Sequence, residues 1–397
     1  MGLLRGRYTP QMQAAMTRLG SKLPFREAAE EIWYSYQTLP DEATLRRVTQ
    51  RHGAAAEALV EQEVAMLERD APEASAWPQQ LLVSADGAFV PLTSGEPREV
   101  KSVAVGEFTT EWDPRNWEAR VKTQDISYFS RSYAVRDFER QALAELHRRG
   151  LENAQTVVAV NDGAAWIQSF LDYHCPQAVR ILDFAHAASY LAQAGKGVWE
   201  EESEAFQGWY ASACHRLKHA PPQETLANLR LLQPKAKTEE QTAAIDGALF
   251  YLQSRRQMLD YAHFRRCGYP IGSGCVESGH KVVVQRRMTG AGMRWAEHHV
   301  DPMLALRNLI CNGRWQAGWQ QITLYQQEQQ LARRLQAADS KQPPPSAPIT
   351  FAGLKAAGLL PDEDLPAESP LPNKSGPGPD HPWRNNKWPT REAWRWN

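Results

Sequence analysis

The stretch AQTVVAVNDGAAWI, residues 154–167, decides the fold that this sequence predicts. Its first half is apolar and rich in valine, which is typical of a central strand that is covered on both faces. The apolar run stops at Asp162-Gly163, and a short helix is expected after that pair. A buried strand that leads through a polar turn into a helix indicates an α/β sheet.

The segments on either side extend this pattern. Three runs with strand-like composition and one helical run come before it: LLVSADGAFVPL (81–92), REVKSVAVGEFTT (98–110), KTQDISYFSRS (122–132) and AVRDFERQALAELHRRG (134–150). After it, AVRILDFAHAASYL (178–191) has the pattern of a second buried strand that runs into a helix. Three strands, a helix, a strand, a helix and a strand predict a mixed-sheet α/β domain.

Composition and turn residues divide the rest of the chain into segments. The predicted organisation is a helical segment over 1–75, the first part of the α/β core over 76–186, an all-helical insertion over 187–268, the last part of the core over 269–336 and a Pro/Gly-rich tail over 337–397. The helical stretch therefore interrupts the α/β pattern before the core is complete.

The N-terminal segment contains two short amphipathic runs around a turn near Leu39 and Pro40, and the second run is expected to end at Gly53. Two such helices resemble a helix-turn-helix, in which the second helix enters a major groove of DNA. Arg46, Arg47 and Arg51 on the second helix are candidate DNA contacts. Plain packing of a helical hairpin explains the pattern equally well.

Composition limits the protein classes that remain. The chain has 397 residues and a formal net charge of -1, so nucleic-acid binding would have to come from local basic patches. Its five cysteines form no C-x-x-C pair, which argues against a disulfide framework and a thiolate zinc site. Neither a secretory signal nor a run near the roughly 18 apolar residues of a membrane span is present. An intracellular protein is expected.

Three acids occur where such a core can hold a metal. Asp86 and Asp162 are each expected at or near the C-terminal end of a buried strand, and each precedes a glycine, whereas Glu277 lies on a later helix. An Asp-Gly pair by itself is also a common turn. If the three acids converge, their hard oxygen atoms suit Mg²⁺, and two such ions support in-line phosphoryl transfer on nucleic acid.

The helix that carries Glu277 follows the turn in YPIGSGCVESGHKVVVQRRM, residues 269–288. At α-helical spacing, Glu277, Lys281 and Gln285 share one face, so Lys281 can contact the phosphate that the metal ions polarise. Further candidate DNA contacts extend this basic surface: Arg286, Arg287, Arg294 and Trp295. Trp295 is a candidate for stacking on a base, with packing as the alternative. A solvated basic helix with one paired glutamate is the alternative for the whole surface.

These motifs, in this order, resemble the DDE transposases of bacterial insertion sequences, and in particular the Kra group, which is related to Mutator-like and hAT-like transposases. The matching stretches are ADGAF around Asp86, NDGAAW around Asp162, CVES around Glu277 and the GMRW that ends at Trp295. DFAH, Asp183 to His186, matches the C/D-x-x-H motif of these enzymes, and both residues are possible supports of the metal site. A simple helix cap is the alternative for this pair.

The resemblance implies a specific fold and activity. It implies an RNase H-like core split by a helical insertion, with Asp86, Asp162 and Glu277 as catalytic residues and metal ligands. The implied cofactor is a pair of Mg²⁺ ions per active site, which Mn²⁺ can replace. The implied partners are the double-stranded DNA of the transposon ends and the target, and a second copy of the chain in a homodimer or higher oligomer. The implied location is the bacterial cytoplasm, at the nucleoid, with no membrane association.

Two other functions remain open from the sequence. One is a transposon-derived repressor that binds DNA without catalysis, and the other is an RNase H-like nuclease. A glycosidase would also use paired carboxylates, but the basic helix would have no purpose in it.

Overall fold

The computed structural model describes residue 4, residues 6–114 and residues 118–339. The chain divides into two compact units, residues 1–333 and residues 334–397. The predicted tail over 337–397 lies outside the described residues, except that 337–339 form the end of helix α14. No described helix is long and apolar enough to cross a membrane.

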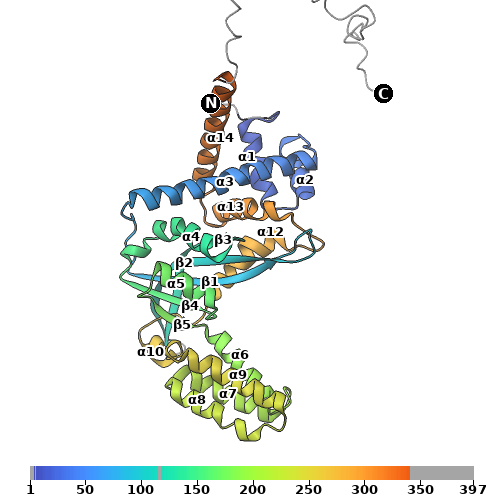
Figure 1. Cartoon of the computed structure of the whole chain (residues 1–397). Helices are drawn as coiled ribbons and strands as arrows, with labels where there is room; N and C mark the ends of the chain where they lie inside the picture. Colours follow the sequence, from blue (N-terminus) through green and yellow to red (C-terminus); the bar gives the residue numbers. More distant parts are fainter. Residues whose placement is uncertain (1–3, 5, 115–117, 340–397) are drawn as a thin grey trace, which may run out of the picture. The chain divides into compact units, whose positions relative to one another are not determined.

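A five-stranded sheet forms the centre of the described part of the first unit (Figure 1). Its strands are β1 (Gln80–Val90), β2 (Arg98–Asp113), β3 (Glu118–Arg131), β4 (Thr156–Asn161) and β5 (Val179–Leu182), in the order β3-β2-β1-β4-β5. β1 and β2 pair antiparallel, as do β2 and β3, whereas β4 is parallel to both β1 and β5. The predicted mixed α/β fold is confirmed.

Successive side chains of β1 point to opposite faces of the sheet and so belong to two different cores. Leu81 packs in the core formed with α4 (Val135–Arg148) and α5 (Ala165–His174), where Phe138 and Phe170 are buried. Leu82 packs in the core on the other side. This double coverage explains why the central strands are apolar at nearly every position.

The second core includes a group of helices between β5 and the loop that leads to Glu277. These helices are α6 (Phe184–Lys196), α7 (Glu204–His219), α8 (Pro222–Arg230), α9 (Glu239–Ser254) and α10 (Tyr261–Arg266). Their buried side chains join those of β4 and β5 in one cluster. The predicted segment boundary between residues 186 and 187 falls inside α6.

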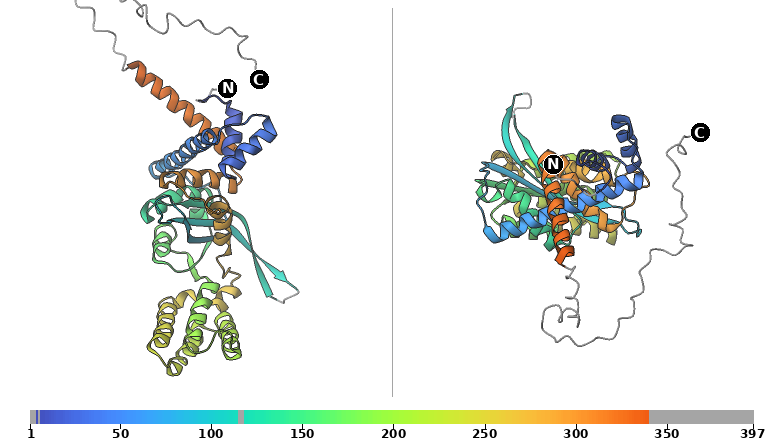
Figure 2. Two further views of the ribbon diagram at one scale, coloured as in Figure 1. Left: turned by 90° about the vertical axis from the view of Figure 1, so that its right-hand side faces the viewer. Right: turned by 90° about the horizontal axis from the view of Figure 1, so that it is seen from above.

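β2 and β3 continue beyond the rest of the sheet as a two-stranded hairpin, which extends away from it in Figure 2. Their pairing reaches from Lys101↔Arg131 to Asp113↔Glu118, whereas β1 pairs with β2 only as far as Glu107.

The N-terminal helices are α1 (Pro10–Gly20), α2 (Phe25–Tyr36) and α3 (Glu42–Asp70). The prediction that the last of them ends at Gly53 is wrong, because α3 continues to Asp70. Gly53 instead lies where α3 crosses α13 (Val300–Cys311), and a Cβ atom at this position would lie 2.6 Å from the Pro302 carbonyl oxygen. The glycine allows two helices to approach closely and does not end one of them.

The last part of the core begins with the helix that carries Glu277. Its parts are α11 (Gly274–Gly279), a π-helical turn (His280–Gln285) and α12 (Arg286–Met288). After α13, helix α14 (Trp315–Asp339) ends the described chain. α11 packs against β1, β2 and β3.

Candidate active site

Asp86 lies within β1 and not at its end, which corrects the sequence prediction. β1 pairs in parallel with β4 only as far as Val83↔Ala159, but it continues its antiparallel pairing with β2 through Asp86 to Val90. Asp86 therefore lies where β1 extends beyond its shorter neighbour β4, so its carboxylate is not covered by that strand. The Gly87 N–H donates to Asp86 Oδ1 at 2.7 Å.

Asp162 directly follows β4, as the sequence predicts. Its Oδ1 accepts the Ala164 N–H at 2.9 Å, which fixes the turn into α5. The neighbouring Asn161 is buried, and its side-chain oxygen accepts the Ala85 N–H beyond the end of the β1–β4 ladder. Asn161 therefore joins the two segments that carry Asp86 and Asp162.

Glu277 is exposed on α11, and the helix after it widens into the π-helical turn. Buried positions along this helix recur every four residues in adjacent pairs: Cys275 and Val276, Gly279 and His280, Val283 and Val284, Arg287 and Met288. In a regular α-helix, with about 3.6 residues per turn, positions four residues apart would turn gradually away from the sheet. The π-helical turn has more residues per turn, so these positions keep facing the sheet. The predicted outward face is kept, because Glu277, Lys281 and Gln285 are all exposed.

Asp162 and Glu277 act electrostatically on Asp86. Burial raises the pKa of the Asp86 carboxyl above its usual range, and the negative charges of Asp162 and Glu277 raise it further. The Gly87 hydrogen bond and the nearby His280 oppose this rise. Among the described residues, no lysine or arginine forms an ion pair with any of the three carboxylates. The cluster therefore contains more negative charge than its protein neighbours compensate.

His280 is a basic side chain beside Asp86. Its Nδ1 atom lies 3.5 Å from Asp86 Oδ2, and the side chain is buried. Burial lowers the pKa of the His280 imidazole, although the charges of Asp86 and Glu277 act in the opposite direction. Its Nε2 atom is buried without a hydrogen-bond partner among the described residues. A neutral imidazole leaves the charge of the acids uncompensated.

The chemistry of this cluster fits divalent cations. Three carboxylates supply the hard oxygen ligands that Mg²⁺ prefers, and no lysine or arginine in the described part of the chain pairs with them and would compete. In the described parts of the chain, no three His, Cys, Asp or Glu side chains are close enough together to hold a metal ion. Asp162 and Glu277 therefore influence Asp86 electrostatically, and the acids would have to move closer together to close around a cation.

Asp183 connects the end of β5 to the loop before Glu277. Its two carboxylate oxygens accept the backbone N–H groups of His186, at 2.7 Å, and Ser273, at 2.8 Å. The first contact caps α6, as the alternative reading of this pair expects, and the second holds the residue before α11. Asp183 therefore orients the chain that carries Glu277 and has no oxygen free of hydrogen bonds.

His186 reaches the site through Tyr251 of α9. Its Nε2 atom lies 3.1 Å from the Tyr251 hydroxyl, which donates to the backbone carbonyl of Asp162. Arg255, one turn further along, donates to the carbonyl of Gly163 at 3.0 Å. Two side chains from the helical stretch therefore hold the turn that presents Asp162.

The basic residues predicted on the Glu277 helix divide into two groups. Lys281, Arg286 and Arg294 are exposed and are available to phosphate. Arg287 is buried, where it donates to the Gly20 carbonyl and lies over the rings of Phe25 and Trp295. Trp295 is 5% exposed and donates its indole N–H to the Met288 carbonyl. Packing explains Arg287 and Trp295, so neither is retained here as a DNA contact.

Five of the predicted DNA contacts line one cavity of about 460 Å³ between the N-terminal helices and the core. They are Arg46 and Arg47 of α3, Arg287, Arg294 and Trp295. No carboxylate belongs to the described lining. Arg51, further along α3, is partly buried and donates to Gln13 at 2.6 Å, so it contributes to helix packing. The cavity is a cationic surface that suits a phosphate backbone.

Sequence reasoning did not find His280, Asn161 or Tyr251. Asn161 directly precedes Asp162 and His280 follows Glu277 by three residues, so their proximity to the acids in sequence was the available signal. Tyr251 lies far from any motif in sequence, and only the tertiary structure brings its hydroxyl group to Asp162.

Comparison with known proteins gives little independent information. No protein-family model matches the chain, and no curated protein matches it. Among solved structures, the Drosophila P element transposase strand transfer complex is similar at 12% sequence identity with a TM-score of 0.27, over 78% of this chain and 81% of that chain. A TM-score of this size carries no argument about fold or function. The fold and the site define an α/β protein with an acidic cluster at its sheet and cationic surfaces nearby.

Proposed function

We propose that this chain is a DDE transposase that cleaves DNA and transfers a DNA strand. The observation that carries the proposal is the electrostatic coupling of Asp86 with Asp162 and Glu277, three carboxylates without a lysine or arginine partner among the described residues. Uncompensated acids beside exposed arginines suit a reaction in which cations lie between the protein and a phosphate. The order of the surrounding sequence motifs supports the same reaction.

In this proposal each group of residues has a separate task. Asp86, Asp162 and Glu277 hold two Mg²⁺ ions, or Mn²⁺ in their place. When bound, these ions stabilise the attacking and departing oxygen atoms of an in-line phosphoryl transfer. Lys281 and Arg286 bind the phosphates beside Glu277, and Arg46, Arg47 and Arg294 bind a neighbouring stretch of the DNA backbone. Asp183, His186 and Tyr251 orient the acids.

The proposed fold family, DNA substrate and oligomeric form follow from the sequence resemblance. The sheet order with its antiparallel β1-β2-β3 part and parallel β4 and β5 is compatible with an RNase H-like core, and α6–α10 would be the insertion that splits it. The proposed substrate is the double-stranded DNA at the ends of a bacterial insertion sequence of the Kra group. Because two ends must be joined in one reaction, the proposed active form is a dimer or a higher oligomer.

The proposal is tested with supercoiled plasmid that carries the ends of the element. Wild type is compared with Asp86→Asn, Asp162→Asn and Glu277→Gln in the presence of Mg²⁺, and Glu240→Gln, an exposed acid of α9, is the control. We expect each site variant to lose cleavage by at least about a thousandfold, since electrostatic stabilisation of the transition state contributes on this scale. Glu240→Gln is expected to cleave like wild type.

The products identify the reaction class. Joining of a 3′-hydroxyl end to target DNA is the result expected for a transposase. Hydrolysis without joining would indicate a nuclease, and DNA binding without any cleavage would indicate a repressor. Cleavage by all three site variants at the wild-type rate would refute the assignment of the acids.

A further inference from the structure

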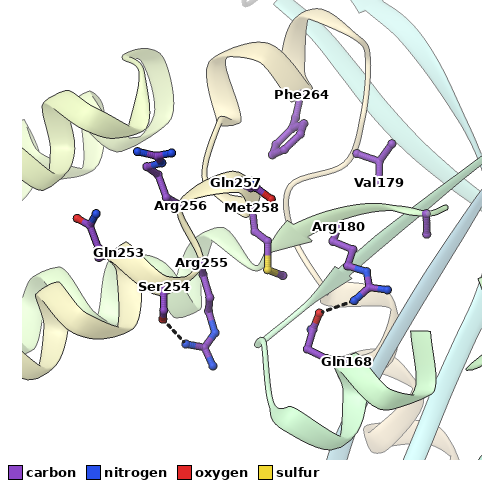
Figure 3. A pocket seen from close by; sticks show the side chains of 11 residues that line it. Gln168, Val179, Arg180, Gln253, Ser254, Arg255, Arg256, Gln257, Met258 and Phe264 are labelled. Atoms are coloured by element: carbon purple, nitrogen blue, oxygen red, sulfur yellow. Dashed lines mark hydrogen bonds between the residues drawn. The ribbon is translucent and has the colours of Figure 1, made fainter. Parts of the chain in front are cut away.

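A second cationic cavity, of about 730 Å³, lies between the loop after α9 and strand β5 (Figure 3). Its polar lining consists of arginine, glutamine and serine side chains: Gln168, Arg180, Gln253, Ser254, Arg255 and Arg256 are among them. No carboxylate belongs to the described lining. In a chain with a formal net charge of -1, a cavity with three arginines and no acid is a local concentration of positive charge.

The three guanidinium groups are not equally available. Arg180 donates to Gln168 at 3.1 Å and pairs with Asp172 at 2.5 Å, so an acid outside the lining compensates its charge. Arg255 donates only to neutral oxygens, which include the Gly163 carbonyl and the Ser254 hydroxyl, and it lies 3.8 Å from the ring centre of Tyr251. Arg256 is exposed, and its guanidinium group forms no hydrogen bond or ion pair with the described residues. Arg255 and Arg256 therefore carry positive charge without an acidic partner.

The cavity adjoins the turn that presents Asp162. Arg255 lines the cavity and also donates to Gly163, the residue directly after Asp162. The helix that ends before Arg255 also provides Tyr251, whose hydroxyl donates to the Asp162 carbonyl. A DNA strand that has one phosphate at the acids would thus pass close to this cavity.

We propose that this cavity binds the phosphodiester backbone of the DNA strand that extends from the cleavage site. Arg256 supplies a planar donor group that fits phosphate oxygens, Arg255 adds positive charge beside it, and the glutamine side chains supply neutral donors. Phe264, the aromatic side chain in the lining, is 6% exposed and offers no face for stacking a base. Backbone contacts without base stacking favour a strand of nucleic acid over a free nucleotide. The proposal rests on the proposed function, since it requires DNA at the acids.

The test is DNA binding by the full chain in EDTA, measured by fluorescence anisotropy over a range of salt concentrations. Arg256→Gln removes one exposed charge, and Lys237→Gln removes an exposed charge of the same helical stretch outside the cavity. We expect Arg256→Gln to weaken binding about tenfold and to lower the slope of log Kd against log salt by about one. Arg256→Lys should restore part of the affinity, which separates loss of charge from misfolding.

Three outcomes would overturn the inference. In the first, Arg256→Gln binds DNA with the affinity and salt slope of Lys237→Gln. In the second, Arg256→Lys binds as weakly as Arg256→Gln. In the third, deoxynucleoside triphosphate or pyrophosphate binds, and Arg256→Gln abolishes that binding while DNA affinity stays unchanged, which would assign the cavity to a free phosphate compound. Because the assay contains no divalent ion, it gives its answer whether or not the chain cleaves DNA.

Discussion

The ring of Tyr251, the residue that bonds to the Asp162 carbonyl, is packed against several other side chains. Its ring stacks on Tyr190 with 3.9 Å between ring centres, and the guanidinium group of Arg255 lies on it at 3.8 Å. Its hydroxyl bonds to the Asp162 carbonyl and to His186. A ring that is fixed on several sides can keep a backbone carbonyl, and so the adjacent carboxylate, in one position.

Tyr251→Phe keeps the ring and removes these hydrogen bonds. We expect kcat for DNA cleavage to fall about tenfold with little change in KM, because loss of one hydrogen bond and slight misplacement of Asp162 act on the chemical step. The measurement is steady-state cleavage. Tyr210→Phe is the matched control, because it also removes a tyrosine hydroxyl group, one that bonds to Cys214. An unchanged kcat would show that Tyr251 does not position Asp162.

His52 is a buried histidine in α3 that stays neutral. Burial, and to a smaller extent the charge of Arg51, lowers the pKa of His52 from 6.5 to about 3. Its Nε2 atom lies 3.1 Å from Gln13 Oε1, and its ring contacts Trp319 edge to face. Because the pKa is lowered in the folded protein, the unfolded chain takes up a proton at this histidine at a higher pH than the folded chain does.

This difference predicts a pH dependence of stability. The contribution of His52 is fully present above pH 6.5 and is lost as the pH falls below that value towards 3, because only the unfolded state is protonated in this window. Between pH 8 and pH 5 wild type should lose about 2 kcal/mol of unfolding free energy that His52→Gln does not lose. Urea unfolding at both pH values measures it, with His215→Gln as control. Equal losses in wild type and His52→Gln would contradict the assignment.

At the scale of elements, the contact between α3 and α13 joins the N-terminal helices to the core. Ala55, Ala56, Ala305 and Leu306 are buried together in this region. Gly53 lies against the backbone of Pro302, so the two helices are closer than any side chain at that position would allow. The placement of the predicted DNA-binding helix therefore depends on Gly53, which has no Cβ atom.

Gly53→Ala should disturb this contact. The new Cβ atom would lie 2.6 Å from a backbone oxygen that cannot rotate away, so we expect a destabilisation of about 1–3 kcal/mol. Gly247→Ala in α9 is the matched control, because its Cβ atom would meet no atom within 4 Å and alanine favours a helix. Thermal unfolding compares the two variants. A Gly53→Ala protein at least as stable as wild type would show that the helices can separate without cost.

The Glu277 helix shows why its details could not be predicted. Glu277, Lys281 and Gln285 were expected on one outer face, and all three are exposed. The buried face, however, includes Gly279, His280 and Arg287, which are not apolar, so the period of four was hidden in the sequence. The π-helical turn that this period requires became visible only in the structure.

At the scale of the whole molecule, the features that could be predicted are those determined by residues that are close together in sequence. The succession of strands and helices along the α/β core and the positions of Asp162 and Glu277 follow from apolar runs, turns and motifs that are contiguous in sequence. Arg287 and Trp295 could not be assigned in this way, because their partners Gly20 and Phe25 come from the opposite end of the described chain. A basic or aromatic side chain has the same local pattern whether it meets solvent or a distant helix.

The central claim is that Asp86, Asp162 and Glu277 together hold two divalent cations. The most direct test is to count bound Mn²⁺ by electron paramagnetic resonance, with DNA present, in wild type and in Asp86→Asn/Asp162→Asn/Glu277→Gln. The account predicts two ions bound per chain in wild type and loss of both in the triple variant, with DNA binding retained. Equal numbers of bound Mn²⁺ in the two proteins would contradict it.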